Sequence, residues 1–258
     1  MSGFTPDPPP PSHLDAISTR WSVLHQAHHE PAPIAGRARA ALAERYGPAI
    51  FAYVRAIVRD EHDAEDLAQE IIVRILCGKF SGADPGRGRF RDFLKVAVRN
   101  LVRTHWGRKA RRSGKDLDVD TIEPPSGNEP DLDEELDREW VLGWRQNLLD
   151  LAWHALDEHQ ARQPGSMAYT VLRLRAEHPD ASGEDLARLV SNEIKREVKP
   201  DAMRQQLRRA RIRFARFLID EVSRSLEDPK PESIQDELVQ LGLYEYVKDF
   251  IEGNDDSE

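Results

Sequence analysis

The stretch GRFRDFLKVAVRNLVRTHWGRKARR, residues 88–112, combines helical periodicity with a concentration of positive charge. It holds nine Arg or Lys and one acid in 25 residues, although the formal charge of the 258-residue chain is −9. Apolar side chains recur at the spacing of one helix face: Phe90, Phe93, Leu94, Ala97, Val98 and Leu101. A second stripe consists of Arg91, Lys95, Arg99 and Arg103, extended by Trp106. The spacing predicts a helix with an apolar inner face and a basic outer face.

This basic stripe suits a surface that follows nucleic-acid phosphates. Like charges four residues apart repel by about 0.2–0.5 kcal/mol per pair in a free helix, so a face selected for stability alone would intersperse acids. Cations without acids favour phosphate binding, because each neutralised phosphate releases condensed counterions. Trp106 would add a plane on which an unstacked base could lie. A solvated cationic face, with Trp106 at the edge of the core, is the alternative.

Charge is segregated along the whole chain. Residues 88–112 sum to +8 and residues 195–216 to +7, whereas residues 116–139 sum to −10 and residues 228–258 to −8. The acidic total therefore conceals two basic segments. This pattern predicts two anion-binding surfaces separated by an acidic spacer.

The cysteine content, the hydropathy and the N-terminal sequence indicate the compartment of the protein. The single cysteine, Cys77, excludes an internal disulfide. No run of about 18 apolar residues is present, so no membrane span is expected. The N-terminal MSGFTPDPPPPSH lacks the apolar core of a signal peptide. We expect a cytoplasmic protein.

The pattern of apolar residues predicts an all-α fold with two small helical domains. Helical spacing is widespread, and sustained alternation of apolar and polar residues is absent. The segment DLDVDTIEPPSGNEPDLDEELD is acidic and contains Pro and Gly, which is typical of a flexible linker. The expected organisation is an N-terminal extension (1–35), a first domain (36–113), an acidic linker (114–139), a second domain (140–226) and an acidic C-terminal extension (227–258).

A second helix is predicted over DAEDLAQEIIVRIL, residues 63–76. Its apolar face consists of Ala64, Leu67, Ala68, Ile71, Ile72, Ile75 and Leu76. The opposite side carries Asp66, Gln69 and Glu70, with Val73 among them. This arrangement fits a partner surface in which acids surround an apolar spot. It fits equally a solvated face with one tolerated valine.

In the second domain, GEDLARLVSNEIKREVKPDAMRQQLRRARIRFARFL (183–218) predicts a helix, a turn and a second helix that begins at Pro200. The polar side of the second helix is basic, with Lys199 just before it and then Arg204, Gln205, Arg208 and Arg211. A basic second helix can enter a major groove, where Arg and Gln read guanine and adenine edges. An arginine-rich solvated helix is the alternative.

Three of these segments resemble a known family when taken together. DAEDLAQEIIVRIL, followed by GRFRDFLKVAVRNLVRTHWGRKARR, resembles conserved region two of the extracytoplasmic-function (ECF) sigma factors of bacterial RNA polymerase. KPDAMRQQLRRARIRF resembles the end of their region four. The resemblance covers about residues 36–226, with the segments in the family's order and the linker between them.

The resemblance implies partners and residue roles. Core RNA polymerase would dock on Asp66, Gln69, Glu70 and Val73. The minus-ten promoter element would be opened and held by Arg91, Lys95, Arg99, Asn100, Arg103, Trp106, Arg108 and Lys109. The minus-thirty-five element would be read by Lys199, Arg204, Gln205, Arg208 and Arg211. An anti-sigma factor or another regulator is a further candidate partner. No cofactor and no metal are expected.

Other functions are less well supported. The carboxylates between Asp60 and Glu70 could hold Mg²⁺ for a nuclease, but no second carboxylate group or catalytic lysine is placed to meet them. His25, His28 and His29 lack further ligands at zinc spacing. We therefore expect no enzyme. A stand-alone helix-turn-helix transcription regulator is the main alternative to a sigma factor.

The acidic C-terminal extension predicts one or two further helices. Ile234, Leu238, Leu241, Val247 and Phe250 supply apolar positions within DPKPESIQDELVQLGLYEYVKDFIEG. One hypothesis is that this extension folds back and masks a basic surface. The alternative is an ordinary solvated extension.

Overall fold

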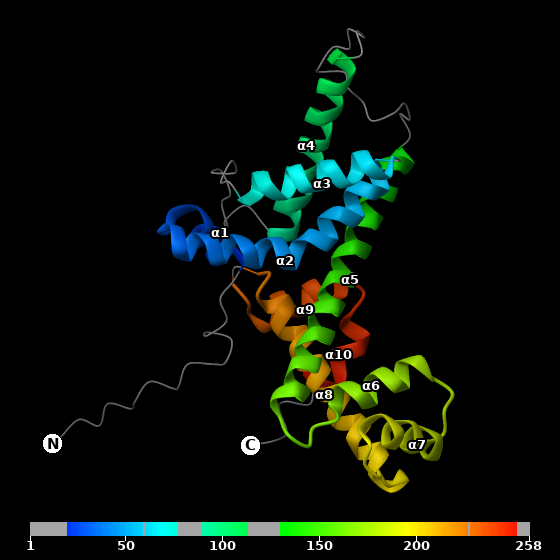
Figure 1. Ribbon diagram of the computed structural model, residues 1–258. Helices are drawn as coiled ribbons and strands as arrows, with labels where there is room; N and C mark the ends of the chain where they lie inside the picture. Colours follow the sequence, from blue (N-terminus) through cyan, green and yellow to red (C-terminus); the bar gives the residue numbers. More distant parts are fainter. Residues whose placement is uncertain (1–19, 59, 77–88, 113–129, 227, 252–258) are drawn as a thin grey trace, which may run out of the picture.

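The computed structural model describes residues 20–58, 60–76, 89–112, 130–226 and 228–251 (Figure 1). All regular elements in these ranges are α-helices, which confirms the all-α class. The helices are α1 (Arg20–His29), α2 (Ala32–Ile57), α3 (Glu61–Leu76), α4 (Phe90–Arg112), α5 (Pro130–Arg162), α6 (Ala168–Glu177), α7 (Gly183–Ile194), α8 (Pro200–Ser223), α9 (Pro231–Gln240) and α10 (Tyr244–Ile251). Part of the expected N-terminal extension, 1–35, is therefore helical.

Helix α2 packs against three other helices, α1, α3 and α5. Its buried residues include Ala38, Leu42, Tyr46, Ile50 and Tyr53, which recur every three or four positions along one face. Helix α3 turns its predicted apolar face inward, with Ala64, Leu67, Ala68 and Ile71 buried. The side chains of Ile75 and Leu76 lie outside the described residues.

Helix α5 connects the two halves of the molecule and runs along both (Figure 1). One stripe with a residue at every fourth position, each at most 2% exposed, is buried along its length: Trp140, Trp144, Leu148, Ala152 and Leu156. The helix starts at Pro130, inside the segment 114–139 that we expected to be linker. The proline suits the first helical position, and the buried stripe secures the helix; residues 113–129 lie outside the described ranges.

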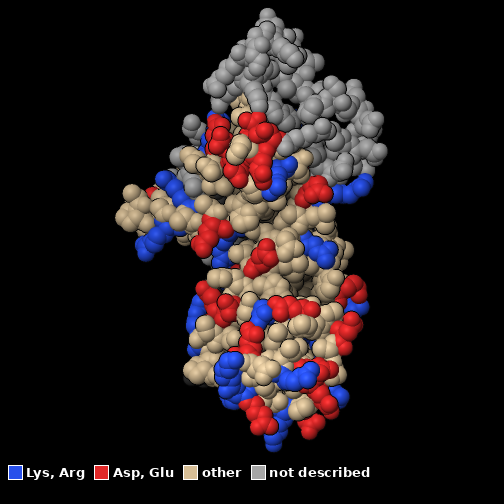
Figure 2. Space-filling model, turned by 45° about the vertical axis from the view of Figure 1, so that its right-hand side comes forward, with Lys and Arg blue, Asp and Glu red and all other residues tan. Residues whose placement is uncertain are grey.

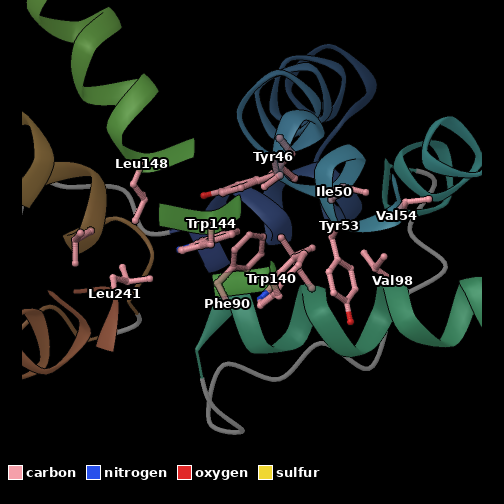
Figure 3. Packing of buried hydrophobic residues seen from close by; sticks show 14 of the residues in the cluster. Tyr46, Ile50, Tyr53, Val54, Phe90, Val98, Trp140, Trp144, Leu148 and Leu241 are labelled. Carbon is pink, nitrogen blue, oxygen red and sulfur yellow. The ribbon is translucent and has the colours of Figure 1, made fainter. Parts of the chain in front are cut away.

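The tryptophans of α5 insert into the aromatic core formed by α2 and α4 (Figure 3). Trp144 stacks on Tyr46 with ring centroids 5.1 Å apart, and Trp140 meets Tyr53 edge-on at 5.0 Å. Phe90 of α4 lies 5.0 Å from Tyr46. Large apolar side chains that follow the expected linker thus complete the core formed by residues that precede it.

A second, smaller core lies between α6, α7 and α8. It is built from Met167, Val171, Leu174, Leu186, Ala187, Val190, Val198 and Met203. Ser182 caps α7 by accepting a hydrogen bond from the Asp185 amide at 3.1 Å. Lys195 ends that helix in the left-handed conformation, with φ of 54°. The predicted helix, turn and helix are present, with Pro200 in the first turn of α8.

The C-terminal extension forms two helices, α9 and α10, which pack on α8. Gly242 makes the turn between them with φ of 63°, a conformation that glycine adopts without steric cost. Ile234, Leu238, Leu241, Leu243 and Val247 are buried in the same core as the α5 tryptophans. The extension is thus part of the folded molecule and not a solvated appendage.

Candidate nucleic-acid interface

Helix α3 presents the predicted polar face to solvent. Asp66 and Gln69 are exposed, and Val73 is an exposed apolar side chain at 56%. Glu70 is half-buried and forms an ion pair with Arg74 one turn later. Three of the four side chains expected to contact polymerase are therefore accessible, and the fourth is partly covered.

Helix α4 is rotated relative to the expected arrangement. Phe90, Leu94 and Val98 are buried as predicted, but Arg91 is also buried, at 6% exposure. Lys95 and Arg99 are half-buried. The exposed positions are Asp92, Val96, Asn100, Arg103 and Thr104. The predicted basic stripe therefore begins inside the molecule and reaches solvent only towards Arg103.

Acids from distant segments account for this burial. The Glu237 carboxylate lies 2.9 Å from Arg89 Nε and 3.1 Å from Arg91 Nη1. Arg91 also donates a hydrogen bond to Gln240 Oε1 at 2.7 Å, and Arg89 donates to the same oxygen. Lys95 Nζ lies 2.8 Å from Asp137 Oδ1 of α5. Helices α9 and α5 thus neutralise cations at the beginning of α4.

Burial and neighbouring charges act on the pKa of Glu237 in opposite directions. Burial raises the pKa of this carboxyl above its ordinary range, while Arg91 and Arg89 lower it and Asp92 raises it further. Burial is the largest of these effects, so the two arginines only partly compensate for removing the carboxylate from water.

Helix α8 contrasts with α4, because all five predicted contact residues are exposed: Lys199, Arg204, Gln205, Arg208 and Arg211. Met203 and Ala210 face the core, so the exposed side chains occupy the opposite face.

Towards the end of α5, the pKa of His159 is lowered by burial and by the nearby charges of Arg213 and Arg162.

The side chains of Trp106, Arg108 and Lys109 lie outside the described residues, although the backbone there is helical. On the face shown in Figure 2, basic and acidic side chains are interspersed over the lower half of the molecule. None of the described helices is long and apolar enough to cross a membrane. Among the residues that the structure describes, no group of three or more His, Cys, Asp or Glu could hold a metal ion.

The sequence alone gives no site role to four residues that contact one another or α4 cations in the structure: Arg89, Asp137, Glu237 and Gln240. Arg89 lies in the basic segment, and the other three lie in the expected linker and C-terminal extension. A usable signal was present in the every-fourth-residue stripe from Trp140, which predicts a helix beginning before residue 140. The apolar residues of the extension gave a similar signal.

The described residues form an all-α structure with two basic helices, α4 and α8, and part of this structure is similar to a known family. Residues 42–112 match the family model of sigma-70 region 2. This part of the chain is therefore similar to region 2 of the sigma-70 factors, which are transcription initiation factors and not enzymes. No curated protein matches the chain. The matched residues run from α2 to the end of α4 and so include the polar face of α3 and the basic stripe.

Proposed function

We propose that this chain is an ECF-type sigma factor that binds core RNA polymerase and directs it to promoters in the cytoplasm. The match of residues 42–112 to sigma-70 region 2 carries the proposal. It is supported by the exposed polar face of α3, which surrounds Val73, and by the exposed basic face of α8.

Within this proposal, α3 is the polymerase-docking helix. Asp66, Gln69 and Val73 are free of the core, and Leu67 and Ile71 fix the helix from behind. A solvent-exposed valine ringed by polar groups suits the small apolar centre and polar rim of a protein interface. Helix α4 would contact the minus-ten element through Asn100 and Arg103 first, since these residues are already exposed.

Helix α8 would contact the minus-thirty-five element. The α6, α7 and α8 unit has its own apolar core, which holds α8 with its cations facing outward. Arg204, Gln205 and Arg208 lie within the first turns of the helix, where recognition helices contact base edges.

A polymerase-dependent transcription assay tests the proposal. Purified core polymerase and the full chain are incubated with a randomised promoter library, and run-off transcripts are sequenced. We expect transcripts from a common sequence class only when both proteins are present. The double variant Asp66→Ala, Val73→Ala should weaken core binding about tenfold or more, the range of an interface hot spot. Glu65→Ala, an exposed acid elsewhere on α3, is the matched control.

A stand-alone helix-turn-helix regulator is the second candidate, and the separate core of α6, α7 and α8 favours it. Such a protein would bind a specific duplex without polymerase and would yield no transcripts. Sequence-specific retention of duplex DNA by the chain alone, together with no capture of core polymerase, would select this alternative.

A further inference from the structure

We propose that helix α9 competes with DNA phosphates for the cations at the start of α4, so that the C-terminal extension holds the chain in a closed, weakly DNA-binding state. This inference rests on the proposed function, because it assumes that α4 contacts promoter DNA. It concerns the extension, which lies outside the segment matched to sigma-70 region 2.

The contact geometry carries the inference. Glu237 and Gln240 are three residues apart on α9 and therefore project from the same face. Each contacts both Arg89 and Arg91, the carboxylate as an ion pair and the amide oxygen as a hydrogen-bond acceptor. Two guanidinium groups facing clustered oxygens form the arrangement in which arginines bind phosphate. The α9 side chains thus occupy the sites that phosphate oxygens would take.

A second acid reinforces the closed state. Asp137 of α5 holds Lys95 one turn further along α4, at 2.8 Å. Three successive cations, Arg89, Arg91 and Lys95, therefore contact acids that come from outside the matched segment. Both acids belong to the acidic segments of the sequence, 116–139 and 228–258, and both pair with cations of the basic segment 88–112.

The closed contact is suited to release. Within the described part of the chain, neither Arg91 Nη1 nor Glu237 Oε2 has a hydrogen-bond partner of good geometry, although both are buried. Buried ion pairs with incomplete hydrogen bonding contribute little net stability, because desolvation offsets their attraction. A phosphate backbone that competes for these arginines therefore displaces a weak contact.

Release would leave a measurable signature. Helix α9 has 10 residues and α10 has 8, and isolated helices of this length are marginal in water. Their apolar residues, including Ile234 and Leu238, are held by the shared core. If α9 leaves α4, amide hydrogens of residues 231–251 should exchange faster.

The test compares two charge reversals on one helix. Glu237→Lys places a cation against Arg89 and Arg91, whereas Asp236→Lys makes the same change in charge at an exposed neighbouring position. The probe is a forked DNA duplex with a single-stranded arm, titrated with the full chain at several salt concentrations. Freeing two arginines should steepen the slope of log K against log salt by about 1.8 relative to Asp236→Lys. Adding Arg91→Ala to Glu237→Lys should remove about half of this gain.

Each outcome is decisive. Equal affinity and equal salt slope for Glu237→Lys and Asp236→Lys overturn the competition. Circular dichroism establishes that both variants fold; if Glu237→Lys does not, amide exchange of the wild-type chain replaces the comparison. Faster exchange in residues 231–251 when forked DNA binds supports the proposal, and unchanged protection overturns it. If the wild-type chain directs no polymerase-dependent transcription, the proposed function fails and this inference with it. If transcription is normal but Glu237→Lys and Asp236→Lys bind forked DNA with the same affinity and salt slope, only the proposed competition is rejected.

Discussion

Helices α4 and α8 are both basic, but the fold treats their cations differently. On α8, Arg204, Arg208 and Arg211 face solvent, held outward by a small core of their own. On α4, Arg91 and Lys95 contact acids from α9 and α5. A run of Arg and Lys in a sequence therefore indicates that a segment can bind anions. The tertiary structure determines whether those cations are exposed or already paired with acids of the same chain.

The difference follows from how each helix is buried. In the first half of helix α8, Met203 and Ala210 are buried on one face and the cations on the other face are exposed, as in an amphipathic helix. At the start of helix α4, the tryptophan stripe of α5 and the apolar residues of α9 share its core. Burying those apolar groups brings Asp137 and Glu237 beside α4, and the ion pairs then avoid leaving buried charge uncompensated.

The largest expected effects are losses of stability on truncating one buried side chain in each of the two apolar cores. Trp144→Ala should lower the free energy of unfolding by about 3–5 kcal/mol and reduce amide protection in α4 as well as α5, because Trp144 is fully buried against Tyr46. Leu186→Ala should cost about 2–5 kcal/mol, with lost protection concentrated in α6, α7 and α8. Urea unfolding and segment-resolved hydrogen exchange measure both.

The exposed residue Leu142, on the same helix, provides the control for this comparison. Leu142→Ala should change stability by no more than about 0.5 kcal/mol. Unaltered amide protection of α4 in Trp144→Ala would show that the stability of α4 does not depend on the tryptophans of α5.

The next effect distinguishes the proposed DNA contacts of the two helices. Arg208→Ala should weaken binding of the full chain to its preferred duplex by about 1–3 kcal/mol, because an exposed arginine can read a guanine edge directly. Arg91→Ala should change the affinity of the free chain little, since Glu237 already occupies that side chain. Fluorescence anisotropy at fixed salt measures both variants.

Arg216→Ala, an exposed position two turns beyond Arg208, controls for loss of charge alone. If Arg91→Ala weakened binding as strongly as Arg208→Ala, the contrast between paired and exposed cations would be wrong.

The sequence predicted the individual helices well where one apolar stripe determined them. The faces of α3 and α8 are visible from the spacing of Leu67 and Ile71, or of Met203 and Ala210, and the structure buries the same residues. Pro200 likewise marked the start of α8. These features depend on local periodicity, which a single segment contains in full.

The sequence did not predict how the helices combine. The spacing of residues along α4 predicts that Arg91 faces solvent, because Glu237, which pairs with it, lies 146 residues away in the sequence. Composition also misled, since the acids of DLDEELD concealed a helix whose apolar stripe starts only at Trp140. Contacts between distant segments depend on shape as well as pattern, so the pattern of one helix does not reveal which of its cations are paired with acids from elsewhere.

A smaller effect concerns the salt dependence of DNA binding. Lys199→Ala should reduce the slope of log K against log salt by about 0.9 if this exposed cation contacts one phosphate. Lys95→Ala should leave the slope unchanged, because Asp137 already neutralises Lys95. Asp137→Asn should steepen the slope by freeing Lys95. Titration of forked duplex DNA at several salt concentrations measures all three, and a reduced slope in Lys95→Ala would mean that Lys95 reaches DNA in spite of Asp137.

The smallest effect is the contribution of Glu237 to the pH dependence of stability. Its pKa is raised in the folded state, chiefly by burial, whereas in the unfolded chain it titrates near the ordinary value of about 4.3. Below that value Glu237 is protonated in both states. As the pH rises from there, the unfolded state loses the proton first, so the folded state binds more protons and stability falls until the raised pKa is passed. Because a single carboxyl exchanges at most one proton, the loss cannot exceed about 1.4 kcal/mol per pH unit. Arg89 and Arg91 offset part of the burial and so limit the total loss. Urea unfolding of wild type and Glu237→Gln should therefore diverge in favour of the variant as the pH rises towards neutral, while Asp236→Asn, at an exposed position, should follow wild type. Parallel curves for wild type and Glu237→Gln would mean that the two arginines compensate fully for burial, and that the closed contact is tighter than its geometry indicates.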